Sequence, residues 1–150
     1  SKDANEQTFY MSNMQPRVHV FNAGIWQKME ACIQSNAYRG EVVYVCKGGT
    51  IDKDSQILTH TKSGFIVPRY FFMAVLMKGE KGYHAFGFWV EHLYENHSSD
   101  RLSQYVVNID ELERLTGIDF FCNLPDELEH KVEHESVQEV RSYFRSWGIN

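Results

Sequence analysis

The central feature of the 150-residue sequence is a pair of apolar runs separated by a short turn. The first run covers 70–77 and consists of Tyr-Phe-Phe-Met-Ala-Val-Leu-Met, and the second covers 83–90. The turn between them, at 78–82, contains two glycines and three charged residues. Apolar runs joined by a glycine-containing turn are typical of paired antiparallel strands. The sequence therefore predicts a central hairpin on which the other segments pack.

The remaining segments predict an α+β fold, a largely antiparallel sheet flanked by helices. The other predicted strands are 8–11, 42–46 and 105–107, with a hairpin excursion over 50–64. The predicted helices are 22–36, 110–115 closed by Gly117, 125–134 and 136–146. The run 42–46 is continuously apolar, so we expect that strand to be buried.

The stretch 9–30 combines apolar and aromatic residues with polar side chains that a plain core segment does not need. Asn13, Asn22 and Glu30 lie among residues such as Phe21 and Trp26. Oxygen donors on a rigid, apolar-backed scaffold suit a hard cation that keeps most of its waters, and Mg²⁺ is the usual case. The stretch is therefore a candidate metal site.

The same stretch resembles the second half of the signature of the DNA/RNA non-specific endonucleases, the ββα-metal nucleases of the Serratia and mitochondrial type. That family has Ser-Asn-Met-x-Pro-Gln followed by Phe-Asn-x-Gly-x-Trp-x-x-Leu-Glu. The positions that match at the family spacing are Asn13, Pro16, Phe21, Asn22, Gly24, Trp26 and Glu30. Segments 64–72 and 109–121 are also similar to family segments, so the resemblance covers about residues 8–134.

The resemblance implies the ββα-metal nuclease fold and a metal-dependent endonuclease that hydrolyses phosphodiester bonds of DNA and RNA without sequence preference. It implies that the amide oxygen of Asn22 binds Mg²⁺ directly, or Mn²⁺ or Ca²⁺ in its place. Glu30 is expected to reach the ion through a water, and Asn13 to orient the phosphate or a water. Arg17 stands where the family usually has Gln and is the expected substrate-binding residue. The implied partners are a divalent metal and the phosphates of DNA and RNA.

One family motif, Asp-Arg-Gly-His, does not occur in the sequence. In the family it lies upstream of the stretch and supplies the histidine that activates water. We therefore expect this chain to be the C-terminal part of a single nuclease domain, with the N-terminal part missing, and to be inactive alone. Within 1–150, residues 1–7 are expected to be frayed and 135–150 to form a C-terminal helical extension.

Two alternatives remain open. Taken alone, Asn22 is more typical of a helix N-cap than of a metal ligand, and Glu30 is more typical of a solvated helix surface. The chain as a whole could be a non-catalytic, nuclease-like scaffold or binding domain, which the absent motif favours. The retained Asn13, Asn22 and Glu30 favour the enzyme, because a purely structural descendant does not need them. His19 lies three residues before Asn22, but a loop position does not suit the absent base.

The net charge of −5 argues weakly against a nucleic-acid partner, but the charge is unevenly distributed. Residues 1–81 hold ten Lys/Arg and seven Asp/Glu, whereas 82–150 hold five and thirteen. The half with the candidate site is mildly basic, which is compatible with phosphate binding. A simple solvated surface explains the acidic half equally well.

Four further expectations concern cysteines, membranes, assembly and location. Cys32, Cys46 and Cys122 lack paired spacing, so buried thiols are expected rather than a zinc site or disulfides. No apolar run approaches the ~18 residues of a membrane span, so no membrane partner is expected. An open sheet edge near 8–13 would favour a homodimer. The compartment is left open by the sequence, and the resemblance alone favours a secreted or periplasmic one.

Overall fold

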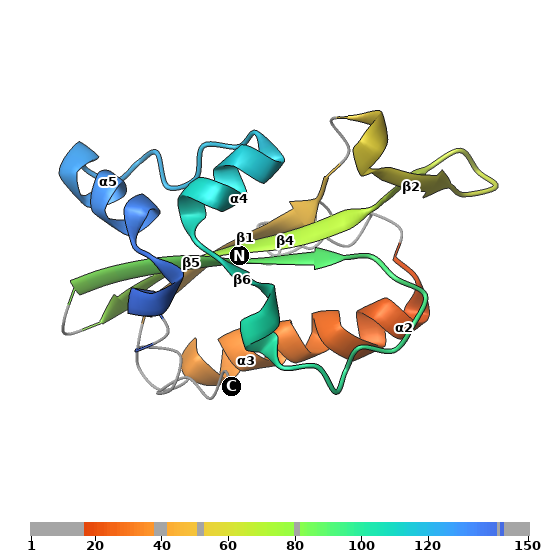
Figure 1. Cartoon of the computed structure of the whole chain (residues 1–150), viewed down its shortest axis with the longest axis horizontal. Coiled ribbons are helices and arrows are strands. Elements are labelled where there is room, and N and C mark those ends of the chain that lie inside the picture. Colours follow the sequence, from red (N-terminus) through yellow and green to blue (C-terminus); the bar gives the residue numbers. More distant parts are fainter. Residues whose placement is uncertain (1–16, 38–41, 51–52, 80–81, 141, 143–150) are drawn as a thin grey trace, which may run out of the picture.

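The computed structural model describes residues 17–37, 42–50, 53–79, 82–140 and 142, and the predicted hairpin lies at its centre (Figure 1). Strands β4 (Tyr70–Gly79) and β5 (Gly82–Glu91) pair antiparallel along their whole length. β1 (Val42–Gly49) pairs with β4, and β6 (Val106–Val107) pairs with β5. The resulting four-stranded sheet has the order β1-β4-β5-β6 and is antiparallel throughout, which confirms the α+β prediction.

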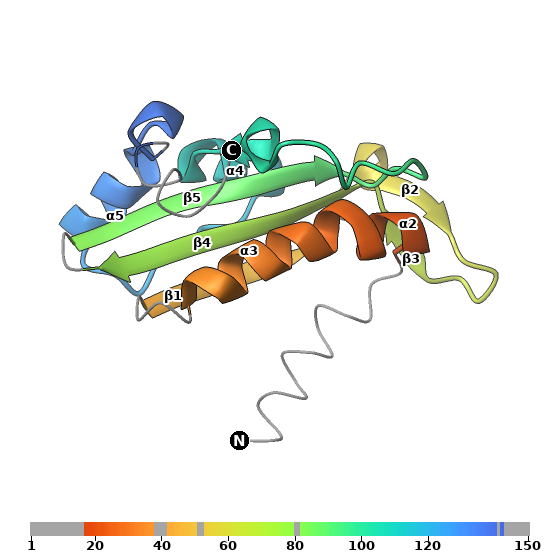
Figure 2. The same ribbon diagram turned by 90° about the horizontal axis from the view of Figure 1, so that it is seen from below.

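Both faces of the sheet are buried, which explains the continuous apolar run in β4. Residues 71, 73, 75 and 77 join one core cluster, and residues 72, 74 and 76 join a second cluster on the other face. None of these seven side chains is more than 4% exposed. A strand covered on both faces gains from apolar residues at every position rather than at alternate ones. The molecule therefore has three layers, with the sheet between two sets of helices (Figure 2).

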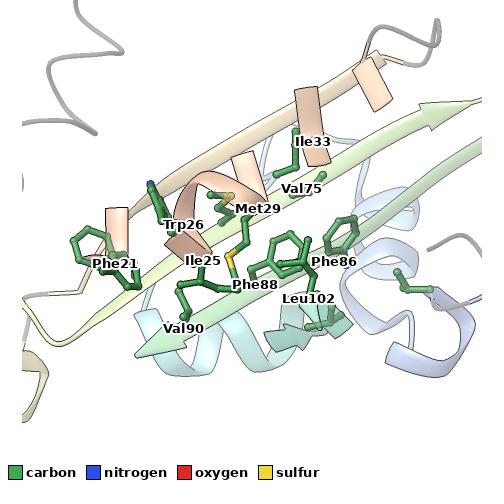
Figure 3. Close-up of a cluster of buried hydrophobic side chains, with 14 of the residues drawn as sticks. Phe21, Ile25, Trp26, Met29, Ile33, Val75, Phe86, Phe88, Val90 and Leu102 are labelled. Carbon is green, nitrogen blue, oxygen red and sulfur yellow. The ribbon is translucent and has the colours of Figure 1, made fainter. Parts of the chain in front are cut away.

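One face is covered by a helical rod that begins earlier than predicted. It consists of α2 (His19–Phe21), the π-helical turn η1 (Asn22–Trp26) and α3 (Gln27–Ala37). The predicted start of the helix at residue 22 is therefore wrong by three residues, because burial of the Phe21 ring stabilises an extra turn over 19–21. The apolar stripe of the rod faces the sheet, and its buried members are Phe21, Ile25, Trp26, Met29 and Ile33 (Figure 3).

The other face is covered by α4 (Ile109–Thr116) and α5 (Asp126–His134), close to the predicted bounds. The Asn108 side chain caps α4 by accepting the backbone N–H of Glu111. Gly117 ends α4 in the left-handed region, at φ 72°, as its position predicted. Residues 137–140 and 142 are helical too, within the predicted 136–146. Val140 there is fully buried in the α3-side cluster.

The prediction that 42–46 is a buried strand is wrong, although the strand itself is present. Val42, Tyr44 and Val45 are 46, 54 and 40% exposed, and β1 forms one end of the strand order. The sequence of an apolar strand does not show whether the strand lies at the edge or in the middle of a sheet. That position depends on which strands pair with it, and these come from distant parts of the chain. Cys46, on this strand, and Cys122 are likewise exposed rather than buried, and Cys32 is half-buried.

The excursion predicted over 50–64 corresponds to a second, two-stranded sheet. It is formed by β2 (Ile57–His60) and β3 (Ile66–Pro68), preceded by the short helix η2 (Asp54–Gln56). Another short helix, η3 (Leu102–Tyr105), precedes β6. The expected strand at 8–11, the open edge at 8–13, Asn13 and the frayed 1–7 lie outside the described residues. No helix in the described ranges is long and apolar enough to cross a membrane.

Candidate metal and phosphate site

The rod that carries Asn22 is kinked at Gly24. Gly24 has φ −99° and ψ −110°, outside the helical region, inside the π-helical turn. A Cβ at this position would lie 3.5 Å from Asn96 Oδ1 and 3.7 Å from Ser98 Cβ, so the loop after β5 packs directly on the kink. Single π-helical turns inside longer helices frequently mark functional sites. The kink separates Asn22 from the regular α3 helix that carries Glu30.

Asn22 lies within the rod and is not its N-cap. Its backbone dihedrals are helical, at φ −65° and ψ −44°, and its N–H donates to Val18 O at 3.0 Å. The N-cap interpretation of Asn22 is therefore wrong, because a helical turn precedes the residue. Its exposed side chain has no capping role in this geometry.

Asn22 and Glu30 line one depression on the solvent side of the rod. Its volume is about 370 Å³, and its lining residues are Asn22, Ala23, Gln27, Glu30, Ala31 and Gln34. Asn22 is exposed and Glu30 is half-buried. The depression lies opposite the apolar stripe, so packing against the sheet fixes the orientation of the polar face. Two residues that carry side-chain oxygens, an amide and a carboxylate, therefore line the same depression.

Lys47, which sequence analysis did not single out, forms an ion pair with Glu30. Its Nζ lies 2.9 Å from Glu30 Oε2, and the two side chains are 28 and 32% exposed. Lys47 is opposite Met73 in the β1–β4 register and so shares the sheet face turned toward α3. One signal was available in the sequence: Lys47 has the same strand parity as Val43 and Val45 but is charged.

Arg17 is half-buried beside the same carboxylate. Its guanidinium carbon lies 5.6 Å from the ring centroids of both Trp26 and Phe71. Burial lowers the pKa of Arg17, and the attraction of Glu30 acts in the opposite direction. Two cationic side chains from different segments thus act on Glu30. Lys47 contacts its carboxylate directly, and Arg17 attracts it through space.

His92 joins the start of the rod to the end of β3. The carbonyl of Pro68 can only accept, so His92 Nδ1–H donates to it at 2.9 Å, and Nε2 accepts the N–H of Val18 at 2.8 Å. The ring is 1% exposed and packs against Phe21 with centroids 4.7 Å apart. Burial lowers the pKa of His92, which favours the neutral form that this geometry requires. His92 is therefore a positioning residue for the segment that leads to Asn22.

The loop after β5 is also hydrogen-bonded to α3. Lys28 Nζ donates to the carbonyls of Ser98 and Asp100, at 3.2 and 2.7 Å. The Asp100 carboxylate accepts the Tyr105 hydroxyl and lies 3.0 Å from His97 Nδ1. The hydrogen bond from Tyr105 lowers the pKa of Asp100, and burial together with this contact raises the pKa of Tyr105. The loop is thereby held against Gly24.

A separate acidic cluster lies on the opposite layer. Carboxylate oxygens of Glu113, Asp119 and Glu133 come within 4.8 Å of one another. Burial, followed by the charges of Glu113 and Glu129, raises the pKa of Glu133 to about 8. The Glu133 carboxyl therefore keeps its proton to a higher pH than an ordinary glutamate does. The cluster lies between α4 and α5, away from the Asn22 depression.

This raised pKa predicts a pH-dependent stability. Folded Glu133 binds its proton more tightly than an unfolded carboxyl of pKa 4.5, so stability is lost as pH rises from about 4.5 to 8. We expect Glu133→Gln to remove about 1–3 kcal/mol of that loss, allowing for partial exposure of the cluster. Urea unfolding at pH 5 and pH 8.5 measures the difference in unfolding free energy between the two pH values for each protein. Glu127→Gln, an exposed site on the same helix, is the control, and an equal pH slope in all three proteins contradicts the assignment.

Comparison with known proteins identifies related sequences and a related fold. The family model for DNA/RNA non-specific endonuclease matches residues 1–127. The chain is 30% identical to mitochondrial Nuclease EXOG of Xenopus laevis over 134 residues, 83% of this chain and 37% of that protein. It is 26% identical to Nuclease C1 of Cunninghamella echinulata var. echinulata over 132 residues, 83% of this chain and 52% of that protein. The chain thus spans about half or less of the length of these relatives.

A solved structure of an EndoG/EndoGI complex has the same fold. The similarity has a TM-score of 0.64 at 21% sequence identity, and it covers 87% of this chain and 57% of that chain. The fold is therefore that of the ββα-metal nucleases, as the resemblance implied. Together with the family match over residues 1–127, these findings show that the chain belongs to the DNA/RNA non-specific endonuclease family.

Proposed function

We propose that this chain forms the metal- and phosphate-binding part of an endonuclease that hydrolyses phosphodiester bonds of DNA and RNA without sequence preference. The observation that carries the proposal is the depression shared by Asn22 and Glu30. Family membership alone does not distinguish a retained site from a lost one. The presence of both oxygen donors in one solvent-facing depression, with cationic side chains beside Glu30, supports retention.

The donor chemistry of the depression fits a hard divalent cation. The amide oxygen of Asn22 is neutral, so as a direct ligand it leaves the charge of the ion undiminished and most coordination positions open. Glu30 follows eight residues later on the same rod and is suited to bind a metal-bound water. When bound, Mg²⁺, or Mn²⁺ or Ca²⁺, offsets charge on the phosphate and makes a bound water more acidic.

The residues of this chain orient and bind rather than move protons. Arg17, held against two aromatic rings, supplies a fixed positive charge for the substrate phosphate. Asn13, outside the described residues, is proposed to orient the phosphate or a water. Contacts to phosphate are the same for every base and for either sugar, so they produce no sequence preference. The general base, a histidine in the family motif, is proposed to come from a segment that these 150 residues do not contain.

The competing function is a non-catalytic, nuclease-like scaffold. The absence of Asp-Arg-Gly-His favours it. The Lys47–Glu30 ion pair must also be accounted for, because it engages the carboxylate proposed to face the metal. A divalent ion carries twice the charge of the Lys47 ammonium, so it can compete with Lys47 for the carboxylate. The ion pair is therefore compatible with either function.

Metal binding tests the proposal without requiring catalysis. In an isotope-labelled chain titrated with Mn²⁺, we expect selective NMR broadening of residues around Asn22 and Glu30. Asn22→Ala removes the proposed direct ligand and is expected to weaken binding at least tenfold, since each 1.4 kcal/mol is a factor of ten. Asn123→Ala, the same change at an exposed position outside the site, should have no effect. Equal broadening in the wild type and Asn22→Ala rules out the metal assignment, and no broadening in the wild type favours the scaffold.

A further inference from the structure

The position of Lys47 is unusual for a charged residue in a sheet. Residues 43, 45 and 47 of β1 share the sheet face turned toward α3, and the first two are valines. Lys47 follows them at the end of the apolar part of the strand, with Gly48 and Gly49 after it. Its side chain is only 28% exposed. A lysine at this depth needs a partner for its ammonium, and Glu30 provides one.

Glu30 creates an electrostatic difficulty for a phosphate-binding depression. Its carboxylate lies in the lining, so by itself it repels the phosphates that the depression is proposed to bind. Lys47 at 2.9 Å and the through-space attraction of Arg17 reverse the sign of the local charge. One carboxylate with two cations leaves a net positive site.

We propose that Lys47 is a phosphate-binding residue of this site. In the free protein its ammonium is held on Glu30, and on binding it contacts a non-bridging oxygen of the nucleic-acid phosphate that lies over the Glu30 end of the depression. In the exchange a phosphate oxygen replaces the Glu30 carboxylate as the partner of the ammonium, so Lys47 keeps an anionic partner in both states. The two glycines after Lys47 leave the end of β1 without side chains, which allows the sugar–phosphate backbone a close approach.

This inference rests on the proposed function, since it assumes a nucleic-acid substrate, but it needs neither metal nor cleavage. Its readout is the binding of a fluorescent single-stranded oligonucleotide in EDTA, measured by anisotropy over a range of NaCl concentrations. We expect Lys47→Met to weaken binding about three- to tenfold and to reduce the slope of log K against log salt by about 0.7, the value for one phosphate contact on a single strand. Lys47→Arg should retain both. Lys131→Met, on the opposite layer, should change neither.

A double-substitution cycle separates phosphate binding from a purely structural ion pair. Glu30→Gln releases Lys47 and should tighten oligonucleotide binding. In the Glu30→Gln background Lys47→Met should then cost more affinity than in the wild type, because the freed ammonium is fully available to phosphate. If Lys47→Met has no effect in that background, Lys47 serves only to hold Glu30 and the inference is wrong. If the wild-type chain binds no oligonucleotide at any salt concentration, the proposed function fails together with it.

Discussion

Replacing Phe71 by alanine is expected to destabilise the protein by about 3–5 kcal/mol, the range for a fully buried phenylalanine. Phe71 is 0% exposed, and its ring lies 5.3 Å from that of Phe21 and 5.4 Å from that of Trp26. The centroid of its ring also lies 5.2 Å from that of the His92 ring. One substitution therefore removes the strand-side support of the rod that carries Asn22, in addition to creating a cavity.

Urea unfolding followed by circular dichroism measures this loss, and a melt should show a decrease in Tm of about 6–20 °C. Phe65→Ala is the matched control, because the same atoms are removed from a side chain that is 56% exposed. That variant should stay within about 0.5 kcal/mol of the wild type. A Phe71→Ala protein as stable as Phe65→Ala would show that the rod is not anchored through these rings.

Local sequence patterns predicted the parts of the fold that depend on short-range order. The 70–77 and 83–90 runs gave the central hairpin because the turn between them fixes their pairing. Gly117 predicted the end of α4 because few other residues adopt φ 72° without strain. Asn22 and Glu30, which the sequence analysis singled out as candidate site residues, line the same depression of the rod.

Contacts between distant segments could not be predicted in the same way. The exposure of β1 depends on which strands lie beside it, and the His92–Val18 hydrogen bond joins residues 74 positions apart. The kink at Gly24 faces a loop that follows β5. The Lys47–Glu30 ion pair requires the β1–β4 register to turn Lys47 toward α3. No periodic pattern in the sequence identifies the partner in any of these contacts, because each pairing is fixed by the packing of the sheet and its helical layers.

The largest expected effect concerns cleavage. The 150-residue chain lacks the family's Asp-Arg-Gly-His, so we expect negligible cleavage of DNA or RNA by the chain alone. Loss of a positioned general base typically costs ~10²–10⁴ in rate, and loss of the surrounding segment costs more through lost orientation. A longer polypeptide in which that motif precedes residue 1 should cleave both nucleic acids in a Mg²⁺-dependent manner. Gel assays with plasmid DNA and structured RNA, with and without EDTA, measure the recovery.

In that longer polypeptide Asn22→Ala should reduce cleavage by ~10² or more, since the substitution removes the only proposed direct ligand and with it the placement of the ion. Fold stability should change by less than ~0.5 kcal/mol, because Asn22 is exposed and is not a helix cap. Asn123→Ala is again the control for removing an exposed amide. A folded longer protein that contains the motif and cuts neither nucleic acid would favour the scaffold. Equal cleavage with and without Asn22 would instead leave an active nuclease whose metal is bound elsewhere, so the two failures are distinguishable in one assay.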